Sequence, residues 1–497
     1  MVGIDIDRES FDEAEHEPFL QRLFASLRAI RTLLERPGFG EGAPSIGAEL
    51  ELNLIDSAGR PARCNEAVLK HAANPRLALE LNQFNLEINS TPVDLTGAPF
   101  TAIGDELRTI LDTTQVAAAH HGARLVPVGI LPTLSTQDVL THAMTDRPRY
   151  RALSNKLREM RGGPFRVRIN GIEPIEMGCD AVTLEGAATS LQLHLRSDPS
   201  RFADIYNAAQ IATAPALAVA SNSPFFLGHR LWDETRIALF KQAVDARTDR
   251  VRAGWPPPRV SFGHGWVRRG ALELFAEAVS LHHPLLPAVS DEDPEAVVAA
   301  GGVPGLEELR LHCGTIWRWN RPVYDATAGG HIRIELRALP AGPTVVDMMA
   351  NAAFLLGLTL GLAPKVYRMV AQLPFECARH NFYRAAQDGL NARLLWPCEA
   401  PPSPRPEPVM SLIARLLDTA YEGLIDAGVD SSEASVLLDV IRNRCETGTT
   451  GAHWQRHAHL VLEDQLGSRA DALHELVNHY CTNVHRGQPV HEWPLLS

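Results

Sequence analysis

Acidic side chains recur at alternate positions in one segment of the chain that has the pattern of a β-strand. Residues 45–56 alternate between apolar side chains and a polar set that includes Glu49 and Glu51. Because successive side chains of a strand point to opposite faces, these two carboxylates must be neighbours on one face. Two carboxylates at such a short distance raise each other's pKa unless a cation lies between them. The spacing therefore predicts a site for a hard divalent cation, Mg²⁺ or Mn²⁺.

Three later segments repeat the alternation and also carry charged, amide or imidazole groups on one face. The segments are residues 84–89, 190–196 and 331–337, and their polar faces include Glu87, Gln192, His194, Arg333, Glu335 and Arg337. An imidazole among carboxylates shifts the expected metal from Mg²⁺ towards Mn²⁺. A single Glu-x-Glu motif or strand histidine is most often structural, whereas four strands that each present such a group favour a shared metal site.

The alternation also predicts the kind of sheet that positions these groups. Strands that alternate, rather than running continuously apolar, belong to an antiparallel sheet with one face in the core. Residues 165–170 form a fifth such segment and add Arg166 and Arg168 to the polar set. The expected fold class is α+β, with helices on the apolar face of the sheet. Apolar residues at helical spacing predict these helices at residues 17–34, 100–121, 199–221 and 229–246.

We expect three parts along the chain. They are an N-terminal helical segment at residues 1–44, a catalytic antiparallel-sheet core at 45–360 and a mostly helical C-terminal region, packed on the core, at 361–497. Within the last part, the Pro-rich residues 400–408 predict a linker or surface loop. The longest apolar stretch, residues 350–364, is too short to span a membrane and predicts a core helix.

The composition is that of an ordinary globular protein and excludes several classes. The 497 residues include 47 Lys and Arg against 59 Asp and Glu, a net charge of −12. This acidic balance argues against a nucleic-acid or anionic-membrane partner, since both need clustered positive charge. The absence of a Gly-x-x-x-x-Gly-Lys-[Ser/Thr] motif excludes a P-loop. The seven cysteines contain no Cys-x-x-Cys pair and the acidic N-terminus is unlike a signal peptide, so we expect reduced thiols in a cytoplasmic protein.

One loop near the C-terminus is open to two interpretations. Arg442, Arg444 and Arg456 flank residues 447–452, whose sequence is Thr-Gly-Thr-Thr-Gly-Ala. Arginines around such a turn form either an anion-binding loop or, more often, a solvated face.

Five motifs, in this order, resemble those of the glutamate–cysteine ligase type 2 family, within the glutamine-synthetase-like carboxylate–amine ligases. They are GAELE at 47–51, ELNQFNLE at 80–87, TSLQLH at 189–194, ASNSPF at 220–225 and RIELR at 333–337. The resemblance covers roughly residues 45–360, and the joint order of the motifs is more specific than any one of them.

The resemblance implies a curved antiparallel sheet that forms a funnel, with ATP at one end and amino-acid substrates at the other. Two or three Mg²⁺ ions would lie on its polar face. The ligands carried over by motif are Glu49, Glu51, Glu80, Glu87 and Glu335, with either Gln192 or His194 from the central strand.

The resemblance also implies roles for residues around these metals. Arg337 would face the transferring phosphoryl group, with Arg333 as a second catalytic arginine on the same strand. Asn222 and Ser223 would lie near bound substrate, and Arg236 would contact a carboxylate or phosphate.

The expected reaction is ATP-dependent formation of a γ-glutamyl amide through an acyl phosphate, with glutamate and cysteine as the small-molecule substrates. Such phosphoryl transfer needs positioning and charge neutralisation more than covalent help from the protein. Three alternatives stay open: the same chemistry with another amine, a metal-dependent hydrolase that uses the same carboxylates, and a binding protein that has lost turnover. The sequence leaves the amine and the oligomeric state undetermined.

Overall fold

At the centre of the structure, a computed structural model that describes residues 6–248, 256–398 and 403–497, lies an eight-stranded sheet. Six strands follow the order β11–β12–β8–β1–β3–β2, and both β4 and β5 pair with β1. Every pairing is antiparallel, which confirms the predicted sheet type. The strands are β1 (Ser45–Ile55), β2 (Leu77–Leu79), β3 (Asn85–Asn89), β4 (Val93–Asp94), β5 (Arg124–Val126), β8 (Leu191–Arg196), β11 (Asn320–Asp325) and β12 (His331–Leu336).

The four segments predicted to carry the chemistry are consecutive neighbours in this sheet. The strands β12, β8, β1 and β3 lie side by side, so their polar faces form one continuous surface. Within it, Glu51 lies opposite Glu87, and Glu49 lies opposite Gln192. The fold class predicted from the alternation is confirmed.

The fifth alternating segment does not belong to the main sheet. It forms β6 (Phe165–Ile169), which pairs with β7 (Ile175–Cys179) in a separate two-stranded hairpin. Arg166 and Arg168 are exposed on this hairpin, so the prediction that they share the polar face is wrong. The alternation correctly predicts a strand, but it does not predict which sheet the strand joins.

Sixteen helices surround the strands in the described residues. Those before β11 are α1 (Glu13–Glu35), α2 (Asn65–Ala72), α3 (Pro99–Ala119), α4 (Pro148–Arg161), α5 (Phe202–Ala220), α6 (Thr235–Ala243), α8 (Ala271–Leu281), α9 (Pro294–Ala299) and α10 (Glu307–Gly314). Those after β12 are α11 (Val345–Leu362), α12 (Val366–Gln372), α13 (Phe375–Asp388), α14 (Val409–Asp426), α15 (Ser431–Thr447), α16 (Gly451–Leu466) and α17 (Arg469–Arg486).

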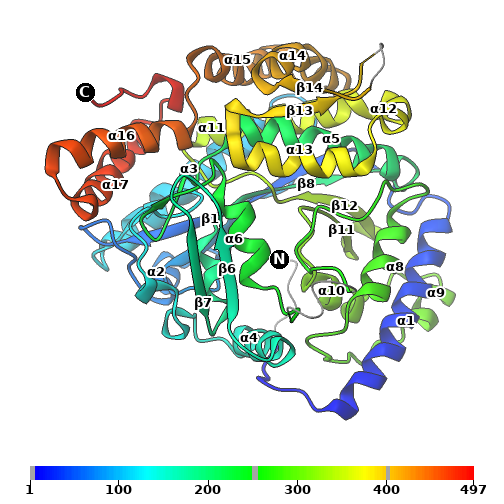
Figure 1. Ribbon diagram of the computed structural model, residues 1–497. Helices are drawn as coiled ribbons and strands as arrows, with labels where there is room; N and C mark the ends of the chain where they lie inside the picture. Colours follow the sequence, from blue (N-terminus) through cyan, green and yellow to red (C-terminus); the bar gives the residue numbers. More distant parts are fainter. Residues whose placement is uncertain (1–5, 249–255, 399–402) are drawn as a thin grey trace.

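The apolar face of the sheet packs against helices, as the alternation requires. Leu50, Leu193 and Ile334 are at most 1% exposed and share one hydrophobic cluster with residues of α5 and α11. Figure 1 shows α5, α13 and α14 stacked above the sheet, with α4, α6 and the β6–β7 hairpin in front of it. The polar face is therefore enclosed by a different set of elements from those that form the core.

Most of the apolar stretch at residues 350–364 lies in the helix α11. The helical run Val345–Gln372 is long and apolar enough to cross a membrane, but 78% of its most apolar window is buried within the protein. It packs on α5, α14 and α15, which confirms the predicted core helix. The same helix crosses the boundary predicted at residue 360, and the three-part division stays a prediction.

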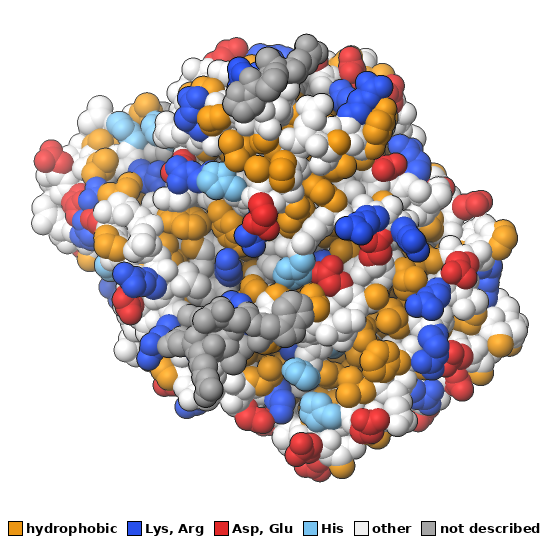
Figure 2. Space-filling model, turned by 45° about the vertical axis from the view of Figure 1, so that its right-hand side comes forward, with side chains coloured by type: hydrophobic (Ala, Val, Ile, Leu, Met, Phe, Trp, Pro, Cys, Tyr) orange, Lys and Arg blue, Asp and Glu red, His pale blue; other side chains and the backbone are white. Residues whose placement is uncertain are grey.

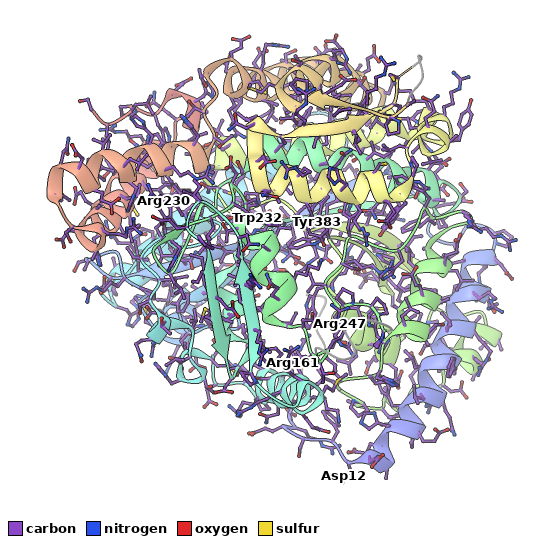
Figure 3. All side chains as sticks on the ribbon, viewed as in Figure 1. Asp12, Arg161, Arg230, Trp232, Arg247 and Tyr383 are labelled. Atoms are coloured by element: carbon purple, nitrogen blue, oxygen red, sulfur yellow. The ribbon has the colours of Figure 1, made fainter. Side chains whose placement is uncertain are left out.

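The C-terminal helices are tied to the rest of the chain through ion pairs. Glu173, in the β6–β7 turn, lies 2.7 Å from Arg230 and 2.8 Å from Arg469 at the start of α17. Figure 3 shows Arg230 where α16 and α17 approach that hairpin. Among the Pro-rich residues 400–408, the described part includes β14 (Arg405–Pro408), paired with β13 (Arg393–Trp396), so this part is a strand and not a loop. Residues 400–402 lie outside the described residues.

Candidate active site

A cavity of about 210 Å³ lies against the polar face of the main sheet. Residues of β1, β3 and β8 line one side, and residues of α4 and of the short helix η3 (Val182–Ala187) line another. Its charged lining residues are Glu49, Glu51, Glu80, Glu87, Arg149, Glu185, Arg321 and Arg337. The cavity thus gathers carboxylates from sequence positions that are far apart.

Three of these carboxylates meet at one place. One oxygen each of Glu51, Glu80 and Glu87 lies within 4.8 Å of the others, and we call these residues the three-glutamate group. Glu51 and Glu87 are directly opposite each other on β1 and β3, and Glu80 follows β2, which pairs with β3. Like charges directly opposite across a strand pair destabilise a sheet, so this arrangement needs compensation.

A second set of candidate ligands lies nearby on β1, β8 and β12. Glu49, His194 and Glu335 each offer one ligand atom within 4.8 Å of the others, and we call them the histidine group. Nε2 of His194 lies 3.2 Å from Oε1 of Glu49 and 3.8 Å from Oε1 of Glu335. The five glutamates that the motifs predict as metal ligands, and His194 of the two central-strand alternatives, therefore fall into these two groups.

Burial and repulsion raise the pKa values in the three-glutamate group. Burial, together with the charge of Glu51, raises the pKa of Glu80 to about 7. Burial and the neighbouring carboxylates, Glu49 first among them, hold the pKa of Glu87 well above its usual range. The pKa of Glu51 is also raised, because burial outweighs the attraction of Arg337. A divalent cation would stabilise the ionised form of all three carboxylates, so this oxygen-only donor set fits Mg²⁺.

The two carboxylates of the histidine group have lowered pKa values. Burial acts to raise the pKa of Glu335, which is fully buried, but Arg321 and Arg337 outweigh it. The pKa of Glu335 therefore lies well below its usual range. Burial likewise acts against ionised Glu49, but its interaction with His194 outweighs burial and lowers the pKa of Glu49 below its usual range. Both carboxylates are ionised and able to act as ligands.

One atom of the histidine group is left without a partner. Nε2 of His194 is buried and has no hydrogen bond to any described residue, although two carboxylate oxygens lie close to it. The oxygen–nitrogen–oxygen set around it fits Mn²⁺ or Mg²⁺. Both oxygens of Glu335 also accept hydrogen bonds from arginines, so a cation here would share this carboxylate with the guanidinium groups.

Gln192 connects the three-glutamate group to an arginine. Its Nε2 donates to Oε1 of Glu51 at 2.8 Å, and its Oε1 accepts from the guanidinium of Arg337. Arg337 also donates to Glu335 at 3.0 Å. Because both ends of the Gln192 amide are engaged, His194 is the central-strand residue with an unpartnered ligand atom. The choice between the two as metal ligand stays a prediction.

Arg333 lies on the polar face but does not line the cavity. Its Nε donates to Nδ1 of His194 at 3.0 Å, and its guanidinium lies 2.6 Å from the carboxylate of Asp325. Arg333 therefore contacts His194, a candidate metal ligand. Its catalytic role stays a prediction.

The remaining predicted residues do not line the cavity. Asn222 and Ser223 are fully buried: Asn222 donates to Ala341 and to Tyr480, and Ser223 donates to Glu234 at 2.6 Å. Neither lines the cavity. These contacts give both side chains a structural role, and their proximity to substrate stays a prediction.

Arg236 acts on the site through the backbone. It is buried beside Glu234, and its guanidinium donates to the carbonyl groups of Arg337 and Ala338. These bonds fix the segment that carries Arg337. Direct contact of Arg236 with a carboxylate or phosphate of substrate stays a prediction.

Three charged lining residues do not follow from the sequence pattern: Arg149, Glu185 and Arg321. Arg321, on β11, pairs with Glu335 across the sheet. The strand that carries it contains Pro322, which weakens the sequence signal for a strand. Glu185 lies in η3, where no alternation could reveal it. The only available signal was its position six residues before the first residue of β8.

Neither interpretation of the C-terminal arginine cluster applies to all its members. Arg444 is 1% exposed and forms an ion pair with Asp347 at 2.7 Å, and Arg456 pairs with Asp233. Only Arg442 is exposed, beside Asp439. Arg444 joins α15 to α11, and Arg456 joins α16 to the segment before α6. The cluster does not form one anion site, because each of these two guanidinium groups has its own carboxylate.

Comparisons with known proteins identify relatives. A family model described as "Glutamate-cysteine ligase family 2(GCS2)" matches residues 45–479. A protein of Mycolicibacterium vanbaalenii named "Putative glutamate--cysteine ligase 2-2" is 34% identical over 116 residues, which are 23% of this chain and 30% of that protein. The similar region thus spans about 30% of that relative's length.

A solved structure shows the same fold over most of the chain. The glutamate–cysteine ligase GshA of Francisella tularensis, in complex with AMP, superposes with a TM-score of 0.55 at 12% identity. The match covers 91% of this chain and 90% of that one. At this identity the likeness concerns the fold alone.

Proposed function

The chain belongs to the glutamate–cysteine ligase family 2, and we propose that it is an ATP-dependent carboxylate–amine ligase that forms a γ-glutamyl amide bond. The proposed substrates are glutamate and cysteine, joined through an acyl-phosphate intermediate. The alternative is the same chemistry with a different amine, such as a polyamine, another amino acid or a peptide. We further propose that the protein acts in the cytoplasm on small molecules.

The observation that carries this proposal is the three-glutamate group beside two arginines in one cavity. Carboxylates directly opposite each other, with raised pKa values, are unfavourable unless cations join them. Arg321 and Arg337 line the same cavity and would bind anionic oxygens. The phosphate groups of Mg·ATP require carboxylates that bind the cation and, beside them, arginines that bind the phosphate oxygens.

The two groups would hold two divalent cations, Mg²⁺ at the three-glutamate group and Mg²⁺ or Mn²⁺ at the site that includes His194. Such ions, when bound, neutralise phosphate oxygens during transfer. The chain's own residues supply the rest. Glu51 is held in place by the backbone N–H of Ser190 at 2.6 Å and by Gln192. Gln192 in turn orients Arg337, so a shift of one side chain would move the others.

Apart from the candidate metal ligands, the charged lining of the cavity offers two kinds of binding group. Arg321 and Arg337 pair with Glu335 and suit a phosphate chain. Glu185, which belongs to neither metal group, suits an ammonium group. We therefore propose that the nucleotide phosphates lie beside the two arginines and the ammonium group of an amino-acid substrate beside Glu185.

The outer surface is consistent with small-molecule substrates. On the face that Figure 2 shows, Lys and Arg side chains are interspersed with Asp and Glu side chains. A polyanionic partner binds more readily to a continuous basic surface. With the net charge of −12, this distribution supports the proposal that the substrates enter the cavity and that no nucleic acid is bound.

The direct test is ADP release across a panel of acids and amines, with Mg²⁺ and ATP. Glutamate with cysteine should give the highest kcat/KM, with one γ-glutamyl product formed per ADP. Turnover with glutamate and another amine, and none with cysteine, would overturn the choice of acceptor. ADP release with none of the pairs would overturn the proposed ligase activity.

A further inference from the structure

Glu185 is a lining carboxylate without an assigned role. It lies in η3, between β7 and β8, and its side chain makes no hydrogen bond or ion pair among the residues that the structure describes. Other carboxylates of the cavity belong to the two candidate metal groups, whereas Glu185 belongs to neither. A partly buried carboxylate that faces a cavity without a partner is unfavourable unless a ligand completes it.

The backbone around Glu185 is rigidly positioned. The side chain of Asn82 donates to the carbonyl of Thr183 at 2.9 Å, which joins η3 to the segment that carries Glu80. A Cβ added to Gly186 would lie 2.5 Å from Nδ2 of Asn82, so only glycine allows this close approach. The N–H of Ala188 donates to the carbonyl of Glu185 at 2.9 Å. The carboxylate is thus presented to the cavity from a fixed turn.

The charges that surround Glu185 favour a cation next to it. Glu80 and Glu51 are the carboxylates that act on it most strongly, and Arg337 opposes them from beyond the end of β12. Arg149 and Tyr150 of α4 line the same cavity. Burial, with these two carboxylates, raises the pKa of Glu185 to about 8. A carboxyl group with such a pKa can exchange a proton near neutral pH.

Resting on the ligase function proposed above, we propose that Glu185 binds the incoming amine as its ammonium ion and accepts a proton from it. The ammonium group gives one proton to the Glu185 carboxylate and becomes a neutral amine with a free electron pair. The nitrogen then forms a bond to the acyl carbon, the carbon–oxygen bond to the phosphate breaks, and phosphate leaves with that electron pair. The second proton lost by nitrogen leaves with phosphate. Glu185 is in this account a catalytic residue, because it touches the reacting amine.

The test compares two nucleophiles in Glu185→Gln, which keeps the side chain's shape but cannot take a proton. Cysteine carries an ammonium group near neutral pH and needs a base, whereas hydroxylamine is largely neutral there and needs none. With ATP and glutamate, the variant should form γ-glutamylcysteine roughly 10²–10⁴-fold more slowly than wild type. Its formation of γ-glutamyl hydroxamate should stay within about threefold of wild type, because positioning of ATP and glutamate is unchanged. A merely structural role would slow both reactions equally.

The pH dependence gives a second readout. In Glu185→Gln the rate with cysteine should rise about tenfold per pH unit, because the neutral amine must then come from solution. In wild type this rate should depend less steeply on pH, because Glu185 takes the proton from the bound ammonium group. The control is Glu176→Gln on the neighbouring strand β7, whose side chain is 71% exposed, and it should match wild type with both nucleophiles.

Each outcome decides the proposal. Equal losses with cysteine and hydroxylamine, or no loss with cysteine, would overturn the role of Glu185 and leave the ligase function standing. A wild-type protein that forms neither product and releases no ADP would overturn the proposed function, and the role of Glu185 with it. If wild type accepts another amine in place of cysteine, the comparison is made with that amine and hydroxylamine.

Discussion

Nε of Arg333 donates a hydrogen bond to Nδ1 of His194 at a distance of 3.0 Å. A guanidinium has donors only, so Nδ1 must be the acceptor, and a neutral ring then carries its proton on Nε2. That nitrogen faces the carboxylate of Glu49 at 3.2 Å. A metal ligand needs its electron pair free, and a ligating histidine normally donates from its other nitrogen. Arg333 therefore opposes metal binding through Nε2 of His194.

The first prediction concerns this opposition. Arg333→Gln introduces a carbonyl that can accept a hydrogen bond from Nδ1 and removes a positive charge. Mn²⁺ affinity should rise by roughly tenfold, the lower end of the effect that such supporting residues have. Titration of free Mn²⁺ by electron paramagnetic resonance measures it. The control is Arg196→Gln, at the register position opposite Arg333, which should change the affinity little. A lower affinity in Arg333→Gln would contradict this account of the contact.

The second prediction separates ligation from folding at Glu87. Glu87→Gln removes one of three repelling carboxylates, so the metal-free protein should unfold at the same or a higher temperature. The rate of ADP release should nevertheless fall by about 10²-fold or more, since a lost ligand costs at least as much as a lost supporting contact. Calorimetry and the coupled assay measure the two effects. An unchanged rate would mean that Glu87 holds no catalytic metal. The exposed Glu159→Gln should leave both quantities unchanged.

The third prediction concerns pH and stability without metal. The pKa values of Glu80 and Glu185, about 7 and about 8, lie above the value of 4.5 expected when unfolded. The folded state therefore holds protons that the unfolded state has released, and stability falls as pH rises from about 4.5 through these values. The Tm in EDTA should decline between about pH 5 and about pH 8.

Metal should weaken that decline. A cation that binds only the folded protein adds about 2.7 kcal/mol at 100 times its dissociation constant. Because it binds the ionised carboxylates, Mg²⁺ or Mn²⁺ should raise the Tm more at pH 8 than at pH 5. A Tm that rises with pH in EDTA, or a metal effect that is larger at low pH, would contradict the assignment of the three-glutamate group.

The fourth prediction contrasts the two arginines of Glu335. Arg321 engages both oxygens of this fully buried carboxylate, so Arg321→Met should cost about 3–5 kcal/mol of unfolding free energy. Arg337→Met leaves that pair intact and should cost less stability, while ADP release falls by roughly 10²–10³-fold. Urea unfolding measures the loss of stability of each variant, and steady-state kinetics measures its rate of ADP release. Equal losses of stability would show that Arg337, too, mainly compensates the buried charge.

The local pattern predicted most of the site because side-chain period follows directly from strand geometry. Glu49, Glu51, Glu87, His194 and Glu335 were placed on polar faces by alternation alone, and the structure brings these faces together. Glu80 lies outside a strand and was reached only through the family resemblance.

Other features could not follow from local pattern. Residues 165–170 alternate as strictly as β1, yet they pair with β7, because strand pairing depends on tertiary contacts and not on the strand's own sequence. The β11 strand carries Pro322 and was missed as a strand. Glu185 depends on the turn of η3 and on Gly186, which only the packed structure reveals.

The most direct measurement is a crystal structure with Mn²⁺ and a non-hydrolysable ATP analogue, read by anomalous scattering. The account predicts one peak among Glu51, Glu80 and Glu87, a second beside Glu49 and Glu335, and the phosphates near Arg337. Peaks elsewhere, or a nucleotide bound outside the cavity with these carboxylates free of metal, would contradict it.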